Sequence, residues 1–484
     1  MPVSKDYLPI AGASGSQETG YTLSQSIRFN DDDSARMGRT PGVVGNRRTW
    51  TLSMWVKRAN LNSSGFHFLF SRAEASIASW IGFYQDTFAY GSASGGHEAR
   101  YYTTRVFRDP SAWYHFVVAS DTTQTSPEDR VRIYVNGERE TSFGTLTVPS
   151  INYQSYFNTT SLHDIGVSRP SGSISGYFDG YMAEFHWLDG TAYGPEYFGE
   201  FNSDGIWIAK EYEGGNYGTN GFYIKGEDSS DLGNDSSGNN NDYSPSGLAA
   251  HDQVLDVPTN NFCVLNPLYG LLDLTLRDGN LDVQGSTATY RRTIGTQGVS
   301  TGKWYYEGYI VATTVNNPGF GWVLTTPENW ANYSLIGTGA HEVAGIFAAT
   351  GQTHVGKAYV NNVLSSSYTS TTAAGDIFGI AVDFDNQGFY IHKNGTYYNS
   401  GDPTSGASKT GSLDASGMEA GAEYIPAASS QDTNSRAHLN FGQDGTFGGR
   451  TTAGGNTDGN GIGNFKHSVP SGYLALCTNN LFRT

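Results

Sequence analysis

The amino-acid sequence predicts an all-β protein built from two antiparallel β-sandwiches in tandem. Aromatic residues make up 13% of the 484-residue chain, which also holds 62 glycines. Aromatic side chains suit pleated surfaces, and glycines suit tight turns. An Asn-Gly pair follows a strand-like run in each half of the chain, at 136–137 and 394–395. Because Asn and Gly tolerate the positive φ angles of a two-residue hairpin turn, we predict a hairpin, and a β-domain, in each half.

Strand candidates follow one another through the first half of the chain. Residues 49–56 alternate between apolar and polar, so that Trp50, Leu52 and Met54 share one face. Further strands are predicted at 113–119, 131–138 and 176–188, and one short helix at 194–198, with proline at its first helical position.

The second half has the same character. Residues 380–385 alternate strictly, which turns Ile380, Val382 and Phe384 to the interior. Further strands are predicted at 302–310, 389–398 and 472–476. Many short strands with frequent turn signals are typical of sandwiches.

Composition sets the domain boundaries. Residues 1–25 are polar and read as an N-terminal arm. Residues 227–261 are rich in Gly, Asn, Ser and Asp and offer little to bury, which predicts a linker. We therefore expect one sandwich over 26–226 and the other over 262–484.

The charge and hydropathy of the chain exclude several classes of function. Its formal net charge is −17, from 29 Lys and Arg against 46 Asp and Glu. Such a field repels a phosphate backbone and an anionic membrane surface, so we expect no nucleic-acid binding. No run of about twenty apolar residues exists, so no membrane insertion is expected. The N-terminus shows no secretory signal.

Two cysteines, Cys263 and Cys477, are too few for a disulfide framework. We predict free buried thiols, with a single bridge between the ends of the second domain as the alternative. There is no paired-Cys motif for zinc.

Two known module types are similar to the two halves. Segments 113–119, 132–138 and 176–187 resemble, in order, those of a laminin-G or concanavalin A-like jelly roll. Segments 302–307, 319–322 and 375–383 resemble those of a SPRY-type sandwich. The resemblance implies a jelly roll followed by a SPRY-like sandwich.

The junction resembles strings in virion proteins of tailed bacteriophages, in which a laminin-G-like module precedes a SPRY-like one. The strings lie at 217–223, 232–239, 258–262 and 265–268. The resemblance implies a non-enzymatic structural protein of the virion, assembled in the host cytoplasm. Its role would be that of a tail or fibre component that adheres to host-surface glycan or docks to other virion proteins, as a homo-oligomer such as a trimer. The arm would dock into the particle.

Two other roles stay open. One is capsid decoration or a head fibre without a receptor. The other is a polysaccharide-degrading enzyme, because concanavalin A-like folds include glycosidases. A retaining glycosidase needs two carboxylates about 5–5.5 Å apart. The nearest set is Asp179, Glu184 and Asp189, whose odd spacing puts neighbours on opposite faces of a regular strand. We therefore predict no catalytic residue.

Glycan binding requires aromatic side chains that can stack on sugar rings. Trp80 and Tyr84, and likewise Trp330 and Tyr333, lie near predicted loops and are the candidates. Packing in a core is the alternative for both pairs. By contrast, the tryptophans inside strand patterns are predicted to be core residues: Trp50, Trp55, Trp113, Trp187, Trp304 and Trp322.

Calcium is the cofactor that the sequence leaves open; no other is expected. Asp228, Asp231, Asp235 and Asp242 offer oxygen ligands within one stretch, as a hard cation requires. Solvated Asx turns explain the same residues equally well.

Overall fold

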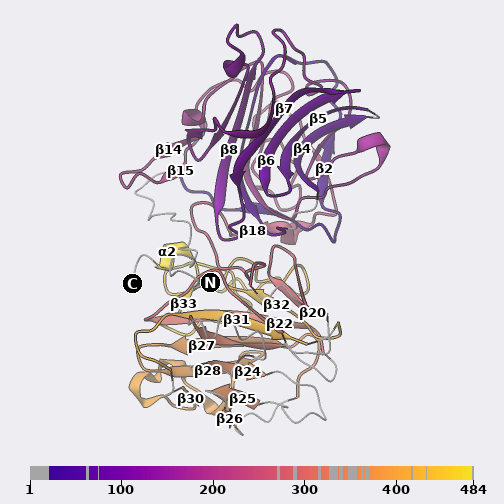
Figure 1. Cartoon of the computed structure of the whole chain (residues 1–484). Coiled ribbons are helices and arrows are strands. Elements are labelled where there is room, and N and C mark those ends of the chain that lie inside the picture. Colours follow the sequence, from indigo (N-terminus) through magenta and orange to yellow (C-terminus); the bar gives the residue numbers. More distant parts are fainter. Residues whose placement is uncertain are drawn as a thin grey trace. The chain divides into compact units, whose positions relative to one another are not determined.

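The computed structural model describes residues 21–61, 65–74, 76–269, 273–286, 291–313, 318–325, 336, 342–346, 357–360, 363–365, 371–415, 418–431 and 433–481. Within these residues the chain forms two compact units (Figure 1). The first unit ends at Thr259 and the second begins at Asn260.

Two eight-stranded antiparallel sheets make up the first unit, coloured indigo to magenta in Figure 1. One sheet has the order β10 (Glu138–Arg139), β9 (Val131–Val135), β8 (Trp113–Asp121), β3 (Thr49–Arg58), β13 (Gly180–Asp189), β1 (Ser26–Phe29) and β18 (Gln253–Val254), with β16 (Phe222–Ile224) on β13. The other has the order β11 (Phe143–Thr147), β7 (His97–Val106), β6 (Thr87–Ser94), β5 (Ile77–Tyr84), β4 (Phe66–Glu74), β12 (His163–Ile165), β2 (Arg36–Arg39) and β17 (Ser244–Ser246).

The core of the first unit lies between these sheets. Trp50, Leu52 and Met54 of β3 are fully buried in it, as their alternation predicts. The Trp50 ring stacks on Trp187 of β13, with 4.9 Å between centroids, and meets Phe157 edge-on. Aromatic burial of this kind is a main source of stability in a sandwich. All six tryptophans predicted to be core residues are buried.

Both predicted hairpins are confirmed. Asn136 and Gly137 have φ angles of 49° and 81°, and β9 pairs with β10 across them. Asn394 and Gly395 have φ angles of 50° and 84° between two strands of the second unit. The local conformation that these residues prefer is therefore the one adopted.

The segment 227–261 is folded against the first sandwich, so the prediction of a linker is wrong. It supplies the edge strands β17 and β18 to both sheets. Its polar side chains are used as hydrogen-bond partners: Asp235 accepts from three backbone N–H groups, and Asn241 donates to the carbonyls of Thr219 and Gly221. Composition misleads here because several of these partners, Thr219, Gly221 and Tyr223, lie outside the segment.

The C-terminal end of the predicted arm is also folded. Residues 1–20 lie outside the described residues, but Leu23 is buried beside Trp55 and Tyr181. The backbone N–H of Leu23 donates to Thr259 Oγ1 at 3.2 Å. The folded chain thus begins before Ser26.

A nine-stranded and a six-stranded sheet make up the second unit. The larger has the order β19 (Leu274–Arg277), β20 (Asp282–Gly285), β32 (Arg436–Asn440), β22 (Lys303–Ala312), β27 (Ile377–Asp383), β28 (Gly388–Lys393) and β29 (Thr396–Tyr397), with β30 (Leu413–Asp414) on β28 and β33 (Leu474–Ala475) parallel to β22. The smaller has the order β21 (Arg291–Ile294), β31 (Tyr424–Ser430), β23 (Gly319–Leu324), β24 (Val343–Ile346), β25 (Lys357–Val360) and β26 (Val363–Ser365). The predicted fold class, two tandem β-sandwiches, is confirmed.

The interior of the second unit follows its sequence pattern. Ile380, Val382 and Phe384 are all buried in its core. Cys263 and Cys477 are buried free thiols, as predicted. Burial raises the pKa of the Cys477 thiol to about 12, so this side chain is a neutral core group at physiological pH.

The remaining elements are short. They are β14 (Gly199–Phe201) paired with β15 (Trp207–Ala209), the 3₁₀ turns η2 (Pro127–Asp129), η3 (Pro170–Gly172), η4 (Pro195–Tyr197), η5 (Ala250–Asp252), η6 (Tyr398–Ser400) and η7 (Pro403–Ser408), and α2 (Thr478–Leu481). The helix predicted at 194–198 is η4, a single 3₁₀ turn opened by its proline. Among the described helices, none is long and apolar enough to cross a membrane.

Candidate binding site

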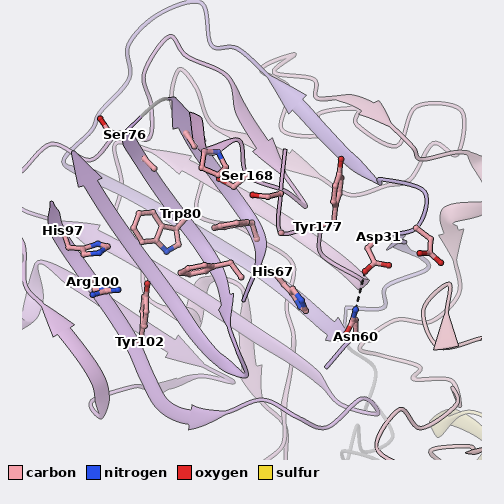
Figure 2. Close-up of a pocket in the computed structure, with 18 residues that line it drawn as sticks. Asp31, Asn60, His67, Ser76, Trp80, His97, Arg100, Tyr102, Ser168 and Tyr177 are labelled. Atoms are coloured by element: carbon pink, nitrogen blue, oxygen red, sulfur yellow. Dashed lines mark hydrogen bonds between the residues drawn. The ribbon is translucent and has the colours of Figure 1, made fainter. Parts of the chain in front are cut away.

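The first sandwich carries a pocket of about 890 Å³ over strands β4 to β7 (Figure 2). Successive side chains of a strand point to opposite faces of its sheet. In β7 the core residue Tyr101 is followed by Tyr102, which lines the pocket, and in β5 the pocket residue Trp80 is followed by the core residue Ile81. The pocket therefore lies on the face of the sheet that points away from the core.

The floor of the pocket depends on a glycine. Trp80 of β5 pairs in register with Gly91 of β6. A Cβ atom at Gly91 would lie 2.2 Å from Cζ2 of the Trp80 indole. The absence of a side chain at this position lets the indole lie directly against the neighbouring strand, which places a flat aromatic surface at the bottom of the pocket.

An aromatic cluster surrounds this indole. The ring of Phe66 lies 5.2 Å from Phe68, 6.1 Å from Trp80 and 4.7 Å from Tyr84, measured between centroids. Tyr84 in turn lies 5.3 Å from Tyr102. A cluster of this kind is a firm platform, because each ring is held by its neighbours.

A β-bulge in β4 makes the arrangement possible. The register of β4 against β5 shifts between Phe68 and Phe70. Leu69 and Phe70 are consequently both buried in the core, while Phe66 and Phe68 line the pocket. The bulge thus lets β4 direct Phe66 and Phe68 to the pocket and the successive residues Leu69 and Phe70 to the core.

The two ends of the pocket carry opposite charge. Figure 2 shows His97 and Arg100 beside Trp80 and Tyr102 at one end, and Asp31 with Asn60 at the other. The Arg100 guanidinium lies 5.0 Å from the Tyr102 ring centroid. Asn60 Nδ2 donates to Asp31 Oδ2 at 3.4 Å. Burial, together with the negative charge of the adjacent Asp32, raises the pKa of the Asp31 carboxyl.

Both histidines of the pocket are uncharged at neutral pH. Burial, with the charge of Arg58 acting in the same direction, lowers the pKa of His67 to about 4. Burial and the nearby Arg100 guanidinium also lower the pKa of His97. Each imidazole can therefore donate one hydrogen bond and accept another at pH 7.

Several polar atoms of the pocket residues are buried without a hydrogen-bond partner among the described residues. They are Trp80 Nε1, Tyr102 Oη and Arg100 Nε. Trp80 is only 8% exposed and Tyr102 only 6%. Buried polar groups normally have partners, and a bound water, ion or ligand atom would supply the partner that these atoms lack.

The structure relocates the aromatic candidates of the sequence. Trp80 and Tyr84 both belong to strand β5, and Tyr84 is its last residue, directly before the turn at 85–86. Trp80 lines the pocket, and Tyr84 contacts two of its aromatic residues, Phe66 and Tyr102. Trp330 and Tyr333 lie outside the described residues.

Sequence reasoning missed most of the pocket. Phe66, Tyr102, Arg100 and Asp31 were not among its candidates, although the alternation of 99–102 was a usable signal for the outward face of β7. That signal does not say which strands are neighbours, and the pocket exists only where β4 to β7 lie side by side.

The four calcium candidates make local hydrogen bonds. Asp228 accepts from the Ser230 backbone and hydroxyl, which lowers the pKa of its carboxyl. Asp235 accepts from backbone N–H groups, and Asp242 accepts from the Asp235 backbone. The Asp231 backbone closes a turn with Asp228. Within the described ranges, no group of three or more His, Cys, Asp or Glu side chains is placed to hold a metal ion.

The carboxylates considered for catalysis have structural partners as well. Glu184 accepts from the hydroxyls of Tyr21 and Tyr223 at 3.0 and 2.5 Å. It stands at a bulge of β13 with a φ angle of 51°, so the regular alternation assumed for its spacing does not hold there. Asp189 accepts from the backbone N–H of Asn46 at 2.7 Å.

A family model agrees with the first sandwich. Residues 29–195 match the Laminin_G_3 model, described as the concanavalin A-like lectin/glucanases superfamily. The first sandwich has a concanavalin A-like fold. The match includes strands β4 to β7 and hence the sheet that carries the pocket.

Two SPRY domains and a pentraxin are among the solved structures to which the chain is similar. The SPRY domain of human HERC1 has 14% identity and a TM-score of 0.26, over 34% of this chain and 91% of that one. The TRIM65 PSpry domain has 11% identity and a TM-score of 0.26, over 37% and 90%. The native heptameric SAP-like pentraxin from Limulus polyphemus has 14% identity and a TM-score of 0.26, over 35% and 77%. No curated protein sequence matches the chain.

Proposed function

We propose that the protein is a non-enzymatic structural protein of a tailed-bacteriophage virion that adheres to host-surface glycan through the pocket over β4 to β7. The observation that carries the glycan-binding role is the Trp80 indole, which lies flat over Gly91 as the floor of a pocket with unpartnered hydrogen-bond donors. A saccharide offers an apolar ring face to such a floor and hydroxyl groups to such donors. The virion part of the proposal is supported by the sequence resemblance at the domain junction.

The mechanism would be weak binding multiplied by copy number. A single open pocket of this size gives modest affinity, but several copies on one particle make the second contact intramolecular. The same chain would dock to other virion proteins, and a homo-oligomer such as a trimer would present several pockets together. Measurement of the position and copy number of the chain on intact particles by cryo-electron microscopy tests this part.

Saccharide binding is tested with the intact chain on an array of host-surface saccharides. Tyr102→Phe removes only a hydroxyl that has no hydrogen-bond partner among the described residues, so the fold is preserved while the ligand contact is lost. Trp80→Ala removes the floor. Phe201→Ala is the matched control, because Phe201 is an aromatic residue of the same unit that is 53% exposed and does not line the pocket.

We expect Tyr102→Phe and Trp80→Ala to lose saccharide binding and Phe201→Ala to keep it. Equal binding by all three variants would overturn the assignment of the pocket. A particle that carries the chain on its capsid lattice and infects normally after its deletion would favour decoration without a receptor. Release of reducing ends from host polysaccharide would instead indicate an enzyme.

A further inference from the structure

Arg100 is an arginine without a charged partner in a strongly acidic protein. The chain has a formal net charge of −17. The side chain of Arg100 forms no hydrogen bond or ion pair with any described residue, and its Nε atom is buried. Two other arginines of the same sheet form ion pairs: Arg72 of β4 lies 3.0 Å from Glu74, and Arg105 of β7 lies 3.1 Å from Glu140.

The guanidinium of Arg100 is held in place by an aromatic ring. It lies 5.0 Å from the centroid of Tyr102, within the range of a cation–π contact. This contact orients the group and leaves its N–H donors unused by the described residues. A planar guanidinium with free donors is the side chain best suited to bind a carboxylate or sulfate.

The other end of the pocket disfavours an anionic group. Asp31 and Asp32 both line it, with Asn60 bonded to Asp31. Carboxylates there repel an anionic group and accept hydrogen bonds from hydroxyls. Because both pocket histidines are uncharged at neutral pH, Arg100 is the one fixed cation among the lining residues. The electrostatic potential of the pocket is thus positive near Arg100 and negative near Asp31 and Asp32.

We infer that the pocket selects an acidic saccharide, whose carboxylate or sulfate binds Arg100 while its ring rests on Trp80 and its hydroxyls face Asp31. This inference rests on the proposed glycan-binding function and adds to it the class of sugar, the direction in which it lies and the residue that decides specificity. A neutral saccharide would leave the guanidinium without an anionic partner.

The test compares acidic saccharides with neutral counterparts. Isothermal titration of the intact chain uses 3′-sialyllactose, 3′-sulfolactose and lactose, and separately trigalacturonic acid and its methyl ester. Arg100→Gln removes the cation. Arg48→Gln is the matched control, because Arg48 is an exposed arginine of the same unit that does not line the pocket. Arg48→Gln changes the net charge of the chain by the same amount as Arg100→Gln.

We expect an acidic member of at least one set to bind at least about tenfold more tightly than its neutral counterpart, because hydrogen bonds to a charged group are the stronger kind. Arg100→Gln should abolish that difference and Arg48→Gln should keep it. The difference should also shrink as salt is raised. Comparison of the sialylated with the sulfated lactose distinguishes a carboxylate from a sulfate.

Equal affinity for acidic and neutral saccharides, unchanged in Arg100→Gln but lost in Tyr102→Phe, would overturn the inference and leave the glycan-binding function standing. Binding that is unchanged in both variants would show a different site and overturn both. Failure of the wild-type chain to bind any of the five saccharides would also count against both.

Discussion

The ion pair between Lys57 and Asp256 tests whether the segment 227–261 is part of the first sandwich. Lys57 Nζ of β3 lies 2.7 Å from Asp256 Oδ2, and both side chains are fully buried. The second carboxylate oxygen accepts from Trp113 Nε1 at 3.0 Å. A residue of the predicted linker thus neutralises a cation in the interior of the sheet.

Asp256→Asn changes this site without changing its shape. The amide oxygen can keep the bond from Trp113, but the amide nitrogen then faces Lys57, donor against donor. The buried ammonium loses its counter-charge. Breaking a buried ion pair from one side costs about 3–5 kcal/mol of unfolding free energy, because an uncompensated charge remains inside. We expect a loss of this size for the first sandwich.

Adding Lys57→Met should recover much of the loss, since no charge is then buried. Asp129→Asn is the control: the Arg139–Asp129 pair is solvent-exposed, at 37% and 42%, and its loss should cost less than about 1 kcal/mol. The measurement is hydrogen exchange of the intact chain in urea, followed by mass spectrometry. Exchange in β3 and β8 reports the free energy of unfolding of the first sandwich, and exchange in β27 is the internal reference for the second. The reasoning would be refuted if Asp256→Asn lowered the free energy of unfolding by less than about 1 kcal/mol. It would also be refuted if the double variant with Lys57→Met were less stable than Asp256→Asn alone.

Three further outcomes are expected. Gly91→Ala should lower the stability of the first sandwich by about 1–3 kcal/mol in thermal denaturation, because the new Cβ would meet the Trp80 indole. Gly96→Ala is the control and should not lower it, because its Cβ would meet nothing within 4 Å. Equal melting temperatures of the two variants would contradict this prediction. Burial raises the pKa of Glu307 from 4.5 to about 7. Between these two pH values the folded protein therefore holds a proton that the unfolded chain has released. The free energy of unfolding should fall by up to about 3 kcal/mol as the pH rises from about 4.5 to 7. Glu307→Gln should lack this slope in pH-dependent urea unfolding, and an unchanged slope would assign it to other groups. EDTA should leave the melting temperature unchanged, because the Asp235 carboxylate already accepts from backbone N–H groups; a fall that calcium reverses would restore the calcium hypothesis.

Some parts of the candidate site were within reach of the sequence. Trp80 was singled out because it is an aromatic residue outside a clear strand pattern. Its true position in β5 was not predicted, since the strand 77–84 contains Ser79 and Gly82 and lacks a regular apolar alternation. The pairing of Trp80 with Gly91 leaves room for the indole over the neighbouring strand. This pairing depends on how two strands align, which the sequence around Trp80 does not show.

The predicted linker failed for a related reason. Its Asn and Asp residues read as solvated turns, because composition records only the lack of apolar side chains. In the structure Asn241 bonds to carbonyls of residues 219 and 221, and Asp256 bonds to Lys57. Polar residues can hold a segment to a domain when their partners are distant in sequence.

Features that depend on neighbouring residues follow from the amino-acid sequence alone. Asn136–Gly137 makes a hairpin because the φ angles of the turn are preferences of these two residues, and Trp50, Leu52 and Met54 face one core because alternation is built into a strand. The pocket, in contrast, forms only in the folded domain. Asp31, Trp80 and Arg100 line one pocket because the turn after β1 is brought beside the outer face of strands β4 to β7, and that arrangement is set by the packing of the whole domain, which no local pattern encodes.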